Sequence, residues 1–182
     1  MKLFTDRLIL RDPTAKDAQH TVRNINNLKI SRYLRRVPYP YGLKDAKSAF
    51  KLSSKKAKKK NREDYHLVIE LKSENKVIGR AGFTGFDRFC QHAEIGYWLG
   101  EKYWKQGFAS EALESLIRFA FKKLKVRRLQ AEVFRENKAS VKLLKKFGFV
   151  KEGLKRQSVR AKATGKWHDT FIYALLKSDC KI

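Results

Sequence analysis

The chain has 182 residues, and 42% of them are hydrophobic, which is enough to bury a domain core and too many for a disordered chain. Lys and Arg total 43 against 18 Asp and Glu, which gives a formal net charge of +25 at pH 7. That charge attracts polyanions such as nucleic acid, ribosomes and phosphate-rich cofactors, and it repels polycations. We expect one domain over residues 1–182. A merely solvated basic surface is the alternative interpretation of the charge.

The apolar segments are short and interrupted by charges, which predicts no membrane-spanning segment. Acidic and basic side chains among Met1–Arg11 exclude the apolar core of a secretory signal. Cys90 and Cys180 form no metal-type cluster, and a pair this far apart is typical of free thiols in a reducing compartment. These features predict a cytoplasmic protein that binds no metal.

The first third of the chain predicts one strand followed by helices. Leu3–Arg11 has the pattern of a strand, and residues 15–34 contain helical segments. Two prolines within residues 37–42 require a loop. Leu43–Lys60 then predicts a helix that ends in a solvated, lysine-rich stretch.

The middle of the chain predicts three consecutive strands and a helix. Apolar residues alternate along Tyr65–Leu71, a polar turn follows, and Val77–Phe86 predicts the return strand. Ala93–Leu99 is the third strand of this antiparallel meander. After a break, residues 109–125 place apolar side chains at helical spacing.

The last third returns to alternating strands and helices. Arg128–Phe134 predicts a strand, and Lys138–Phe147 predicts a short amphipathic helix. Phe149–Leu154 and Phe171–Leu176 predict the closing strands. The order predicts a mixed α/β fold, with helices packed on a sheet of about seven strands.

The segment from residue 97 to residue 113 has the parts of an anion site. A strand runs through a short loop into a helix whose first residues include Gly107, Ala109 and Ser110. The first turn of a helix exposes unpaired N–H groups, and small residues let a phosphate approach them closely. The alternative is an ordinary helix start capped by Ser110. The pattern is neither a P-loop nor G-x-G-x-x-G, which disfavours a nucleotide triphosphatase or a dehydrogenase.

Three segments together resemble a known superfamily. Gln106–Leu113, preceded by Ala93–Leu99, resembles motif A of the GNAT acyl-CoA N-acyltransferases, and Asn137–Ser140 with residues 146–149 resembles motif B. Thr5–Arg11 is similar to the start of the RimJ/RimL-type branch, which acetylates the N-termini of ribosomal proteins.

The resemblance implies a GNAT fold, with a mostly antiparallel sheet splayed at an acetyl-CoA cleft between strands 93–99 and 128–134. It implies that backbone groups at residues 97–99 pair with pantetheine and that residues 104–110 hold the pyrophosphate. It also implies that Asn137 bonds the pantetheine arm, although Asn137 equally fits a helix N-cap. The implied acetyl-CoA residues are Tyr97, Trp98, Leu99, Trp104, Lys105, Gln106, Gly107, Phe108, Ala109, Ser110 and Asn137.

Two positions depart from the pattern of the family. Lys105 stands where the branch commonly has glycine, and it adds a positive charge beside the expected pyrophosphate. Leu144 stands where many members carry a tyrosine acid, and leucine cannot donate a proton. Ser140, one turn earlier, is therefore the candidate that hydrogen-bonds the leaving sulfur. The alternative for Ser140 is a helix serine that bonds its own backbone.

Amide formation also needs a base that deprotonates the acceptor ammonium. Glu94 is the first candidate, because it lies on the cleft-forming strand with the opposite facing to Ile95 and Tyr97. Glu70 is the second, and the alternative for either is a strand carboxylate paired with a cation. His168 and Asp169 are adjacent on a strand, so we do not expect them to form a dyad.

The expected acceptor is the N-terminal amine of a protein such as a ribosomal protein, with the basic surface in contact with the ribosome or RNA. A small-molecule amine is the second hypothesis, although the sequence indicates no acidic cluster to attract a polycation. A non-catalytic basic module that binds ribosomes or RNA is the third. We expect the acceptor loops at Arg35–Gly42 and Gln157–Trp167.

Overall fold

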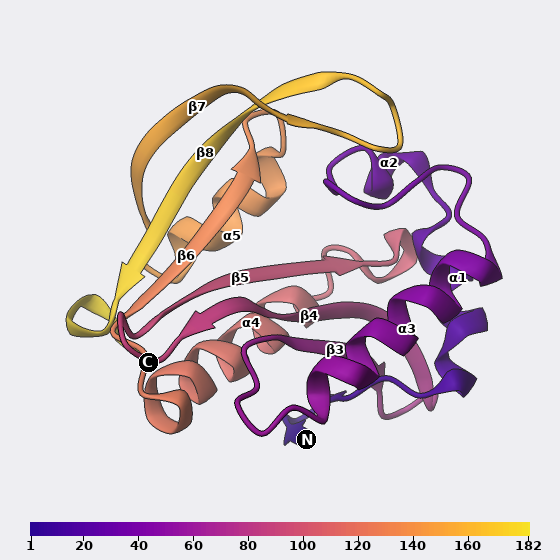
Figure 1. Cartoon of the computed structure of the whole chain (residues 1–182), viewed down its shortest axis with the longest axis horizontal. Coiled ribbons are helices and arrows are strands. Elements are labelled where there is room, and N and C mark those ends of the chain that lie inside the picture. The colour runs from indigo at the N-terminus through magenta and orange to yellow at the C-terminus, as the bar shows by residue number, and fades with distance from the viewer.

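The computed structural model describes residues 1–182, which form one eight-stranded sheet in the order β1-β2-β3-β4-β5-β6-β8-β7 (Figure 1). All neighbouring strands are antiparallel except β5 and β6, which are parallel. Helices pack against both faces of the sheet. The predicted mixed α/β fold is confirmed, with one strand more than expected.

The additional strand arises at the N-terminus. The expected strand Leu3–Arg11 is a hairpin of β1 (Lys2–Phe4) and β2 (Leu8–Arg11), closed by a hydrogen bond from the Thr5 N–H to the Leu8 carbonyl. The helical region that follows contains η1 (Ala15–Asp17), α1 (Ala18–Ile25), α2 (Leu28–Ser31) and α3 (Leu43–Ala57).

The meander is confirmed as β3 (Tyr65–Leu71), β4 (Lys76–Asp87) and β5 (His92–Leu99). A short turn of 3₁₀ helix, η2 (Glu101–Tyr103), precedes α4 (Phe108–Phe119). The helix continues as one wider π-type turn, η3 (Ala120–Leu124).

The C-terminal part differs from expectation in the length of its hairpin. It contains β6 (Arg128–Phe134), α5 (Lys138–Lys146), β7 (Val150–Arg160), β8 (Trp167–Leu176) and η4 (Lys177–Asp179). The region expected as an acceptor loop, Gln157–Trp167, is therefore mostly strand, and only residues 161–166 form the turn. β7 is an edge strand whose side chains are mostly exposed, so it lacks the apolar alternation by which a strand is predicted.

Two apolar clusters lie on opposite faces of the sheet, because neighbouring β3 residues point to opposite sides. Leu67 and Ile69 belong to the larger cluster, with residues of α4 and with Leu144 of α5. Val68 belongs to the smaller one, with residues of α1 and α3. None of the helices is both long enough and apolar enough to cross a bilayer.

The sheet splits at its centre. β5 and β6 pair only between residues 92–94 and 128–130, after which the two strands diverge (Figure 1). Residues 95–99 of β5 therefore have a strand partner on the β4 side but none on the β6 side. This free edge faces the space in which the site lies.

Candidate functional site

A cavity of about 1410 Å³ lies where β5 and β6 diverge. It extends from the first residues of α4 and α5 to α2 and the residues that follow it. Both predicted catalytic residues, Glu94 and Ser140, line it. Gln106 is the one predicted acetyl-CoA residue outside the lining, which includes Tyr97, Trp98, Leu99, Trp104, Lys105, Gly107, Phe108, Ala109, Ser110 and Asn137.

The loop before α4 curves tightly around one end of this cavity. Lys105 and Gly107 both have left-handed backbone conformations, with φ of 60° and 84°. Gly107 is the N-cap of α4, so Ser110 lies inside the helix and the alternative that it caps α4 is wrong. The Nζ of Lys146 instead donates to the Ser110 hydroxyl at 3.4 Å. The unpaired N–H groups of the first helical turn thus lie beside lysines, an arrangement that favours an anion.

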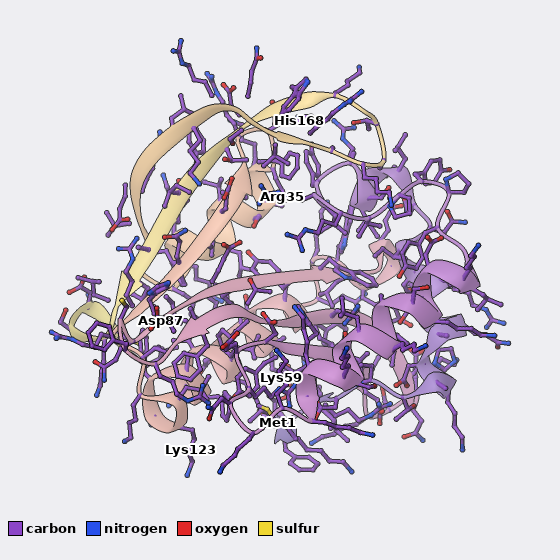
Figure 2. The ribbon with its side chains drawn as sticks, viewed as in Figure 1. Met1, Arg35, Lys59, Asp87, Lys123 and His168 are labelled. Atoms are coloured by element: carbon purple, nitrogen blue, oxygen red, sulfur yellow. The ribbon has the colours of Figure 1, made fainter.

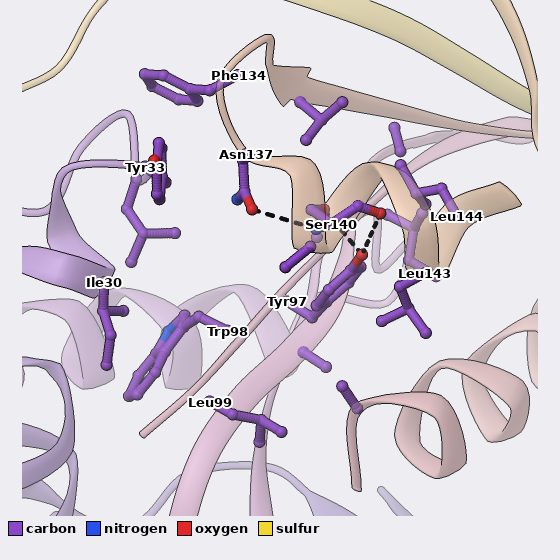
Figure 3. Close-up of a pocket in the computed structure, with 18 of the residues that line it drawn as sticks. Ile30, Tyr33, Tyr97, Trp98, Leu99, Phe134, Asn137, Ser140, Leu143 and Leu144 are labelled. Atoms are coloured by element: carbon purple, nitrogen blue, oxygen red, sulfur yellow. Dashed lines mark hydrogen bonds between the residues drawn. The ribbon is translucent and has the colours of Figure 1, made fainter. Parts of the chain in front are cut away.

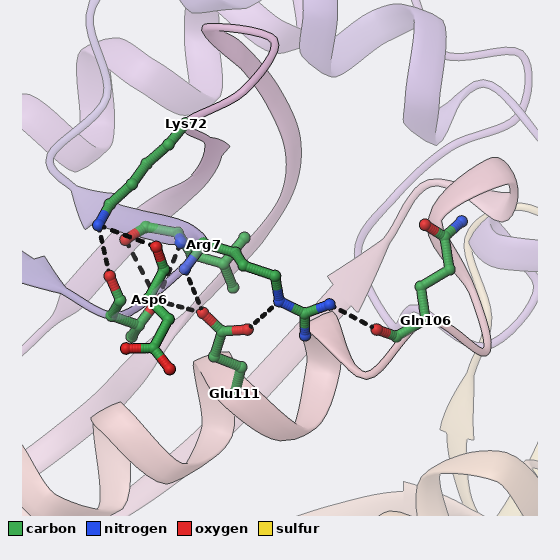
Figure 4. Close-up of polar contacts among 7 residues, drawn as sticks. Asp6, Arg7, Lys72, Gln106 and Glu111 are labelled. Atoms are coloured by element: carbon green, nitrogen blue, oxygen red, sulfur yellow. Dashed lines mark hydrogen bonds and ion pairs between the residues drawn. The ribbon is translucent and has the colours of Figure 1, made fainter.

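An arginine from the N-terminal hairpin holds this loop against α4 (Figure 4). The Nε of Arg7 donates to Glu111 at 2.7 Å, and its Nη1 donates to the Gln106 carbonyl at 3.0 Å. The guanidinium also lies over the Phe108 ring, 4.4 Å from its centre. Glu111 accepts a further bond from the Thr5 hydroxyl at 2.6 Å. Sequence reasoning assigned no role to Arg7 or Glu111, since 104 residues separate them.

The free edge of β5 lies between this loop and α5. The Trp104 indole N–H donates to the Leu99 carbonyl at 2.9 Å, which closes one end of the edge. Asn137 caps α5, because its Oδ1 accepts the Ser140 N–H at 3.2 Å. Asn137 is therefore the N-cap of α5, and its Nδ2 group remains free to donate a hydrogen bond to a ligand.

A tyrosine and a serine meet inside the cavity (Figure 3). The hydroxyls of Tyr97 and Ser140 are 2.9 Å apart, and either oxygen can donate. The Ser140 hydroxyl therefore hydrogen-bonds a side chain, not the backbone of its own helix, which was the alternative expected from the sequence. Burial raises the pKa of Tyr97 to about 12, so the phenol keeps its proton at neutral pH. Sequence reasoning missed this phenol, because it considered only the backbone of Tyr97.

Glu94 and Glu70 have different surroundings. Glu94 is half-buried and makes no hydrogen bond or ion pair. Burial raises its pKa, and the negative charge of Glu132 adds to the shift. Glu70 accepts from Arg11 Nε at 2.7 Å and lies outside the cavity, so the second base candidate is wrong. A carboxylate that is free and raised in pKa is suited to accept a proton from a bound amine.

Three carboxylates line the cavity: Glu94 on β5, Glu132 on β6, and Glu136 in the turn before α5. Nine Lys and Arg side chains line the cavity as well, so the cavity as a whole is not acidic. The three carboxylates were not apparent in the sequence, because the split sheet brings separate segments together. Glu132 accepts from the Thr170 hydroxyl at 2.7 Å, and Glu136 lies 3.5 Å from the ring of His168.

The far wall comes from α2 and from β6–β8 rather than from the expected loops. Of residues 35–42 only Arg35 lines the cavity, and of residues 157–167 only Val159 does. Figure 2 places Arg35 and His168 at the same end of the molecule. Asp169 accepts from the Gln157 N–H at 2.9 Å, and His168 has Glu136 as its acidic neighbour. His168 and Asp169 thus form no dyad, as expected.

A separate polar cluster lies at the β4–β5 turn, away from the cavity. The possible ligand atoms of Asp87, Cys90 and His92 lie within 4.8 Å of one another. Sequence reasoning compared Cys90 only with Cys180 and so missed this group. Asp87 accepts the N–H groups of Phe89 and Cys90, both at 2.8 Å, and these bonds shape the exposed turn. Both cysteines are free.

Comparison with known proteins agrees with this geometry. The family "Acetyltransferase (GNAT) domain" matches residues 7–150. The chain is 33% identical over 177 residues to the uncharacterized N-acetyltransferase p20 of Bacillus licheniformis, covering 97% of each chain. It is 34% identical over 107 residues to the [ribosomal protein uS5]-alanine N-acetyltransferase of Escherichia coli, covering 58% of this chain and 54% of that one.

Among solved structures, the microcin C7 self-immunity acetyltransferase MccE, in complex with acetyl-CoA and AMP, has a TM-score of 0.80. It is 25% identical to this chain, and the match covers 94% of this chain and 93% of that one. The resemblance read from the motif A and motif B segments is thus confirmed at the level of the family. The chain belongs to the GNAT acetyltransferase family and is an N-acetyltransferase.

Proposed function

We propose that this enzyme transfers an acetyl group from acetyl-CoA to the N-terminal amine of a protein. The observation that supports this proposal is one continuous cavity that is lined by lysines beside the start of α4 and, at what we call its acidic end, by the carboxylates Glu94, Glu132 and Glu136. The basic end combines the start of α4 with lysines, which suits a pyrophosphate. The acidic end holds Glu94, which suits an amine. The Tyr97–Ser140 pair lies on the wall of the same cavity.

The acetyl-CoA end is built from backbone and from cations. The N–H groups at the start of α4 bind the pyrophosphate, and Lys105, Lys138 and Lys146 offset its charge. Pantetheine lies along the free edge of β5 as an added strand, because residues 95–99 lack a partner on that side. The free Nδ2 of Asn137 donates to it.

In the acetyl transfer the acceptor nitrogen loses two protons and the sulfur gains one, and Glu94 and Ser140 are the groups proposed to move them. Glu94 takes a proton from the acceptor ammonium, and the neutral amine attacks the thioester carbonyl. The carbon–sulfur bond then breaks. The Ser140 hydroxyl passes its proton to the departing thiolate and takes up the second proton of the attacking nitrogen, so the serine ends the step neutral. Tyr97, 2.9 Å away, donates to Ser140 and stabilises the oxygen that gives up the proton.

Replacing Ser140 with alanine is expected to lower kcat by about 10- to 100-fold and to change acetyl-CoA affinity little, because the bond to sulfur strengthens only in the transition state. Tyr97→Phe should give a smaller loss of the same kind. Steady-state kinetics and calorimetry with CoA measure the two quantities. Ser178→Ala, on exposed η4, is the matched control. An unchanged kcat would return Ser140 to a structural role.

Replacing Arg7 with alanine is expected to weaken CoA binding by about 10-fold, because the loop before α4 loses a charge-assisted bond at each end. Arg7 touches the loop and not the cavity, so it is a positioning residue. Arg7→Lys should restore part of the affinity, while Asp6→Asn, in the same turn, should have no effect. Calorimetry measures the affinities. If Arg7→Ala and the wild type bind CoA with equal affinity, Arg7 does not position this loop for CoA.

Two observations support a protein N-terminus as the acceptor. One relative is named for acetylation of a ribosomal protein, and the net charge of +25 attracts the ribosome. The acidic end of the cavity favours a second candidate, a small cationic amine. The deciding experiment incubates the enzyme with labelled acetyl-CoA, N-terminal peptides and small amines, with mass spectrometry of the products. Acetylation of small amines alone would overturn the protein acceptor.

Binding to ribosomes, if the basic surface steers the enzyme there, is expected to weaken steeply with salt, whereas CoA binding weakens less. The reason is that part of the CoA affinity comes from pantetheine in the cavity, which salt does not screen. Sedimentation with purified ribosomes at two salt concentrations, beside calorimetry with CoA, measures both. The absence of co-sedimentation even at low salt would contradict a steering role for the charge.

A further inference from the structure

The acceptor side of the sheet carries a cation as well as carboxylates. Arg80 of β4 pairs in register with Trp98 of β5, and four residues further along Thr84 pairs with Glu94. Residues two and four apart on a strand point to the same face. Arg80 and Glu94 therefore lie on one face of the sheet, and both line the cavity.

Between these two side chains neither β4 nor β5 presents a side chain to the cavity. Gly82 and Gly96 are directly opposite each other in the register of β4 and β5. A Cβ at Gly82 would collide with the carbonyl oxygen of Tyr65, so this position requires glycine. A Cβ at Gly96 would meet nothing within 4 Å, so the space above it is open. The paired glycines form a trough that leads from Glu94 to Arg80.

Arg80 has no carboxylate partner. Its Nη2 donates to the Ser53 hydroxyl at 3.0 Å, and its guanidinium lies 5.2 Å from the centre of the Phe50 ring. Burial lowers its pKa. Arg11 and Arg62, whose side chains are 18% and 11% exposed, each pair with carboxylates. Arg80 is thus a half-buried charge without compensation, which is costly unless an anion binds it.

The other titratable groups near Arg80 do not compensate it. Burial raises the pKa of Tyr41, so that phenol stays neutral at pH 7. Burial and the charge of Arg80 lower the pKa of His66 to about 4, so the imidazole is neutral as well. An anion in the trough would therefore meet one unshared guanidinium and a neutral imidazole, both of which can donate hydrogen bonds.

We propose that Arg80 binds a carboxylate of the acceptor and that the acceptor is a peptide with Asp or Glu at its second or third residue. Four strand residues separate Arg80 from the position opposite Glu94, which is about 13 Å along the sheet. An extended peptide advances about 3.3–3.6 Å per residue, so its second and third residues lie about 3.5 and about 7 Å from the first. The acidic side chain at either position and the long side chain of Arg80, which extend toward each other, span the remaining distance. This inference rests on the proposed function, in which Glu94 receives the amine.

The test compares peptides that differ only by Glu or Gln at the second or third residue. For the wild type we expect kcat/KM to be about 10-fold higher for at least one Glu peptide than for its Gln counterpart, the scale of one charge-assisted hydrogen bond. In Arg80→Gln this ratio should fall to near one, and Arg80→Lys should retain part of it. Arg127→Gln is the matched control, because Arg127 is exposed and lies outside the cavity. It should keep the wild-type ratio.

Binding of the same peptides in the presence of CoA, measured by calorimetry, separates this proposal from the proposed function. Preferential binding of Glu peptides without any acetyl transfer would retain the subsite and overturn the proposed function. Transfer to Glu and Gln peptides at equal rates would overturn the subsite alone. If Arg80→Gln fails to fold, as judged by thermal melting, the Glu-to-Gln ratio of kcat/KM in the wild type and in Arg80→Lys still tests the proposal. A wild-type ratio near one would contradict the proposal.

Discussion

Replacing Gly107 with glutamate is expected to weaken CoA binding by at least about 100-fold, or about 2.7 kcal/mol. Gly107 has φ of 84°, which strains any other residue, and a Cβ would lie 3.2 Å from Arg7 Nη2. The new side chain would also bring a negative charge to the proposed pyrophosphate site. Both effects act on the loop whose backbone N–H groups we propose to bind the anion.

Gly107→Ala separates the two effects, because it imposes the backbone strain without the charge. We expect an affinity between those of the wild type and Gly107→Glu. Calorimetry with CoA measures all three proteins, and thermal melting shows whether each is folded. A folded Gly107→Glu protein with wild-type affinity would mean that the pyrophosphate does not bind at the start of α4.

The second large effect is expected at Glu94. Glu94→Gln should lower kcat/KM for the acceptor by about 100-fold, the lower end of what a general base contributes, and leave CoA affinity unchanged. Glu114→Gln, on the exposed side of α4, is the control and should behave as wild type. Activity within about twofold of wild type would exclude Glu94 as the base.

The pH dependence gives an independent check of Glu94. Burial and Glu132 raise the pKa of Glu94, and the charges of Arg35, Lys155 and Arg36 oppose that rise. A base works in its deprotonated form, so kcat/KM should be lost as pH falls through the raised pKa and recover above it. The midpoint of the acidic limb of the kcat/KM profile should therefore lie at a higher pH than the ordinary pKa of a glutamate. An acidic limb that is unchanged in Glu94→Gln would belong to another group.

The parts of the fold that the sequence predicted well are those with regular apolar spacing. Tyr65–Leu71 alternates because Tyr65, Leu67, Ile69 and Leu71 all pack in the larger cluster, whereas on the other face only Val68 packs in the smaller one, between the polar residues His66 and Glu70. The full length of β7 was not predicted, because an edge strand whose side chains are exposed to solvent needs no apolar face and so shows no apolar alternation. The N-terminal hairpin was missed for another reason: its turn at Thr5–Arg7 holds no Gly or Pro, and Thr5 and Asp6 alone are a weak turn signal.

The proposed acetyl-CoA side of the cavity was more predictable from the sequence than the proposed acceptor side. Its loop and helix are contiguous in sequence, so a local pattern describes them. The acceptor side is assembled across the split sheet, and its carboxylates come from β5, β6 and the following turn. The bond between Tyr97 and Ser140 likewise joins residues 43 positions apart. Spacing along the chain contains no signal for such pairs.

A crystal structure of the enzyme with bound CoA would show directly which residues hold the cofactor. We expect the pyrophosphate at the N–H groups that begin α4, pantetheine along residues 97–99 of β5, and the sulfur within hydrogen-bonding distance of the Ser140 hydroxyl. A sulfur that lies away from both Ser140 and Tyr97, or CoA bound outside the space between β5 and β6, would contradict this expectation.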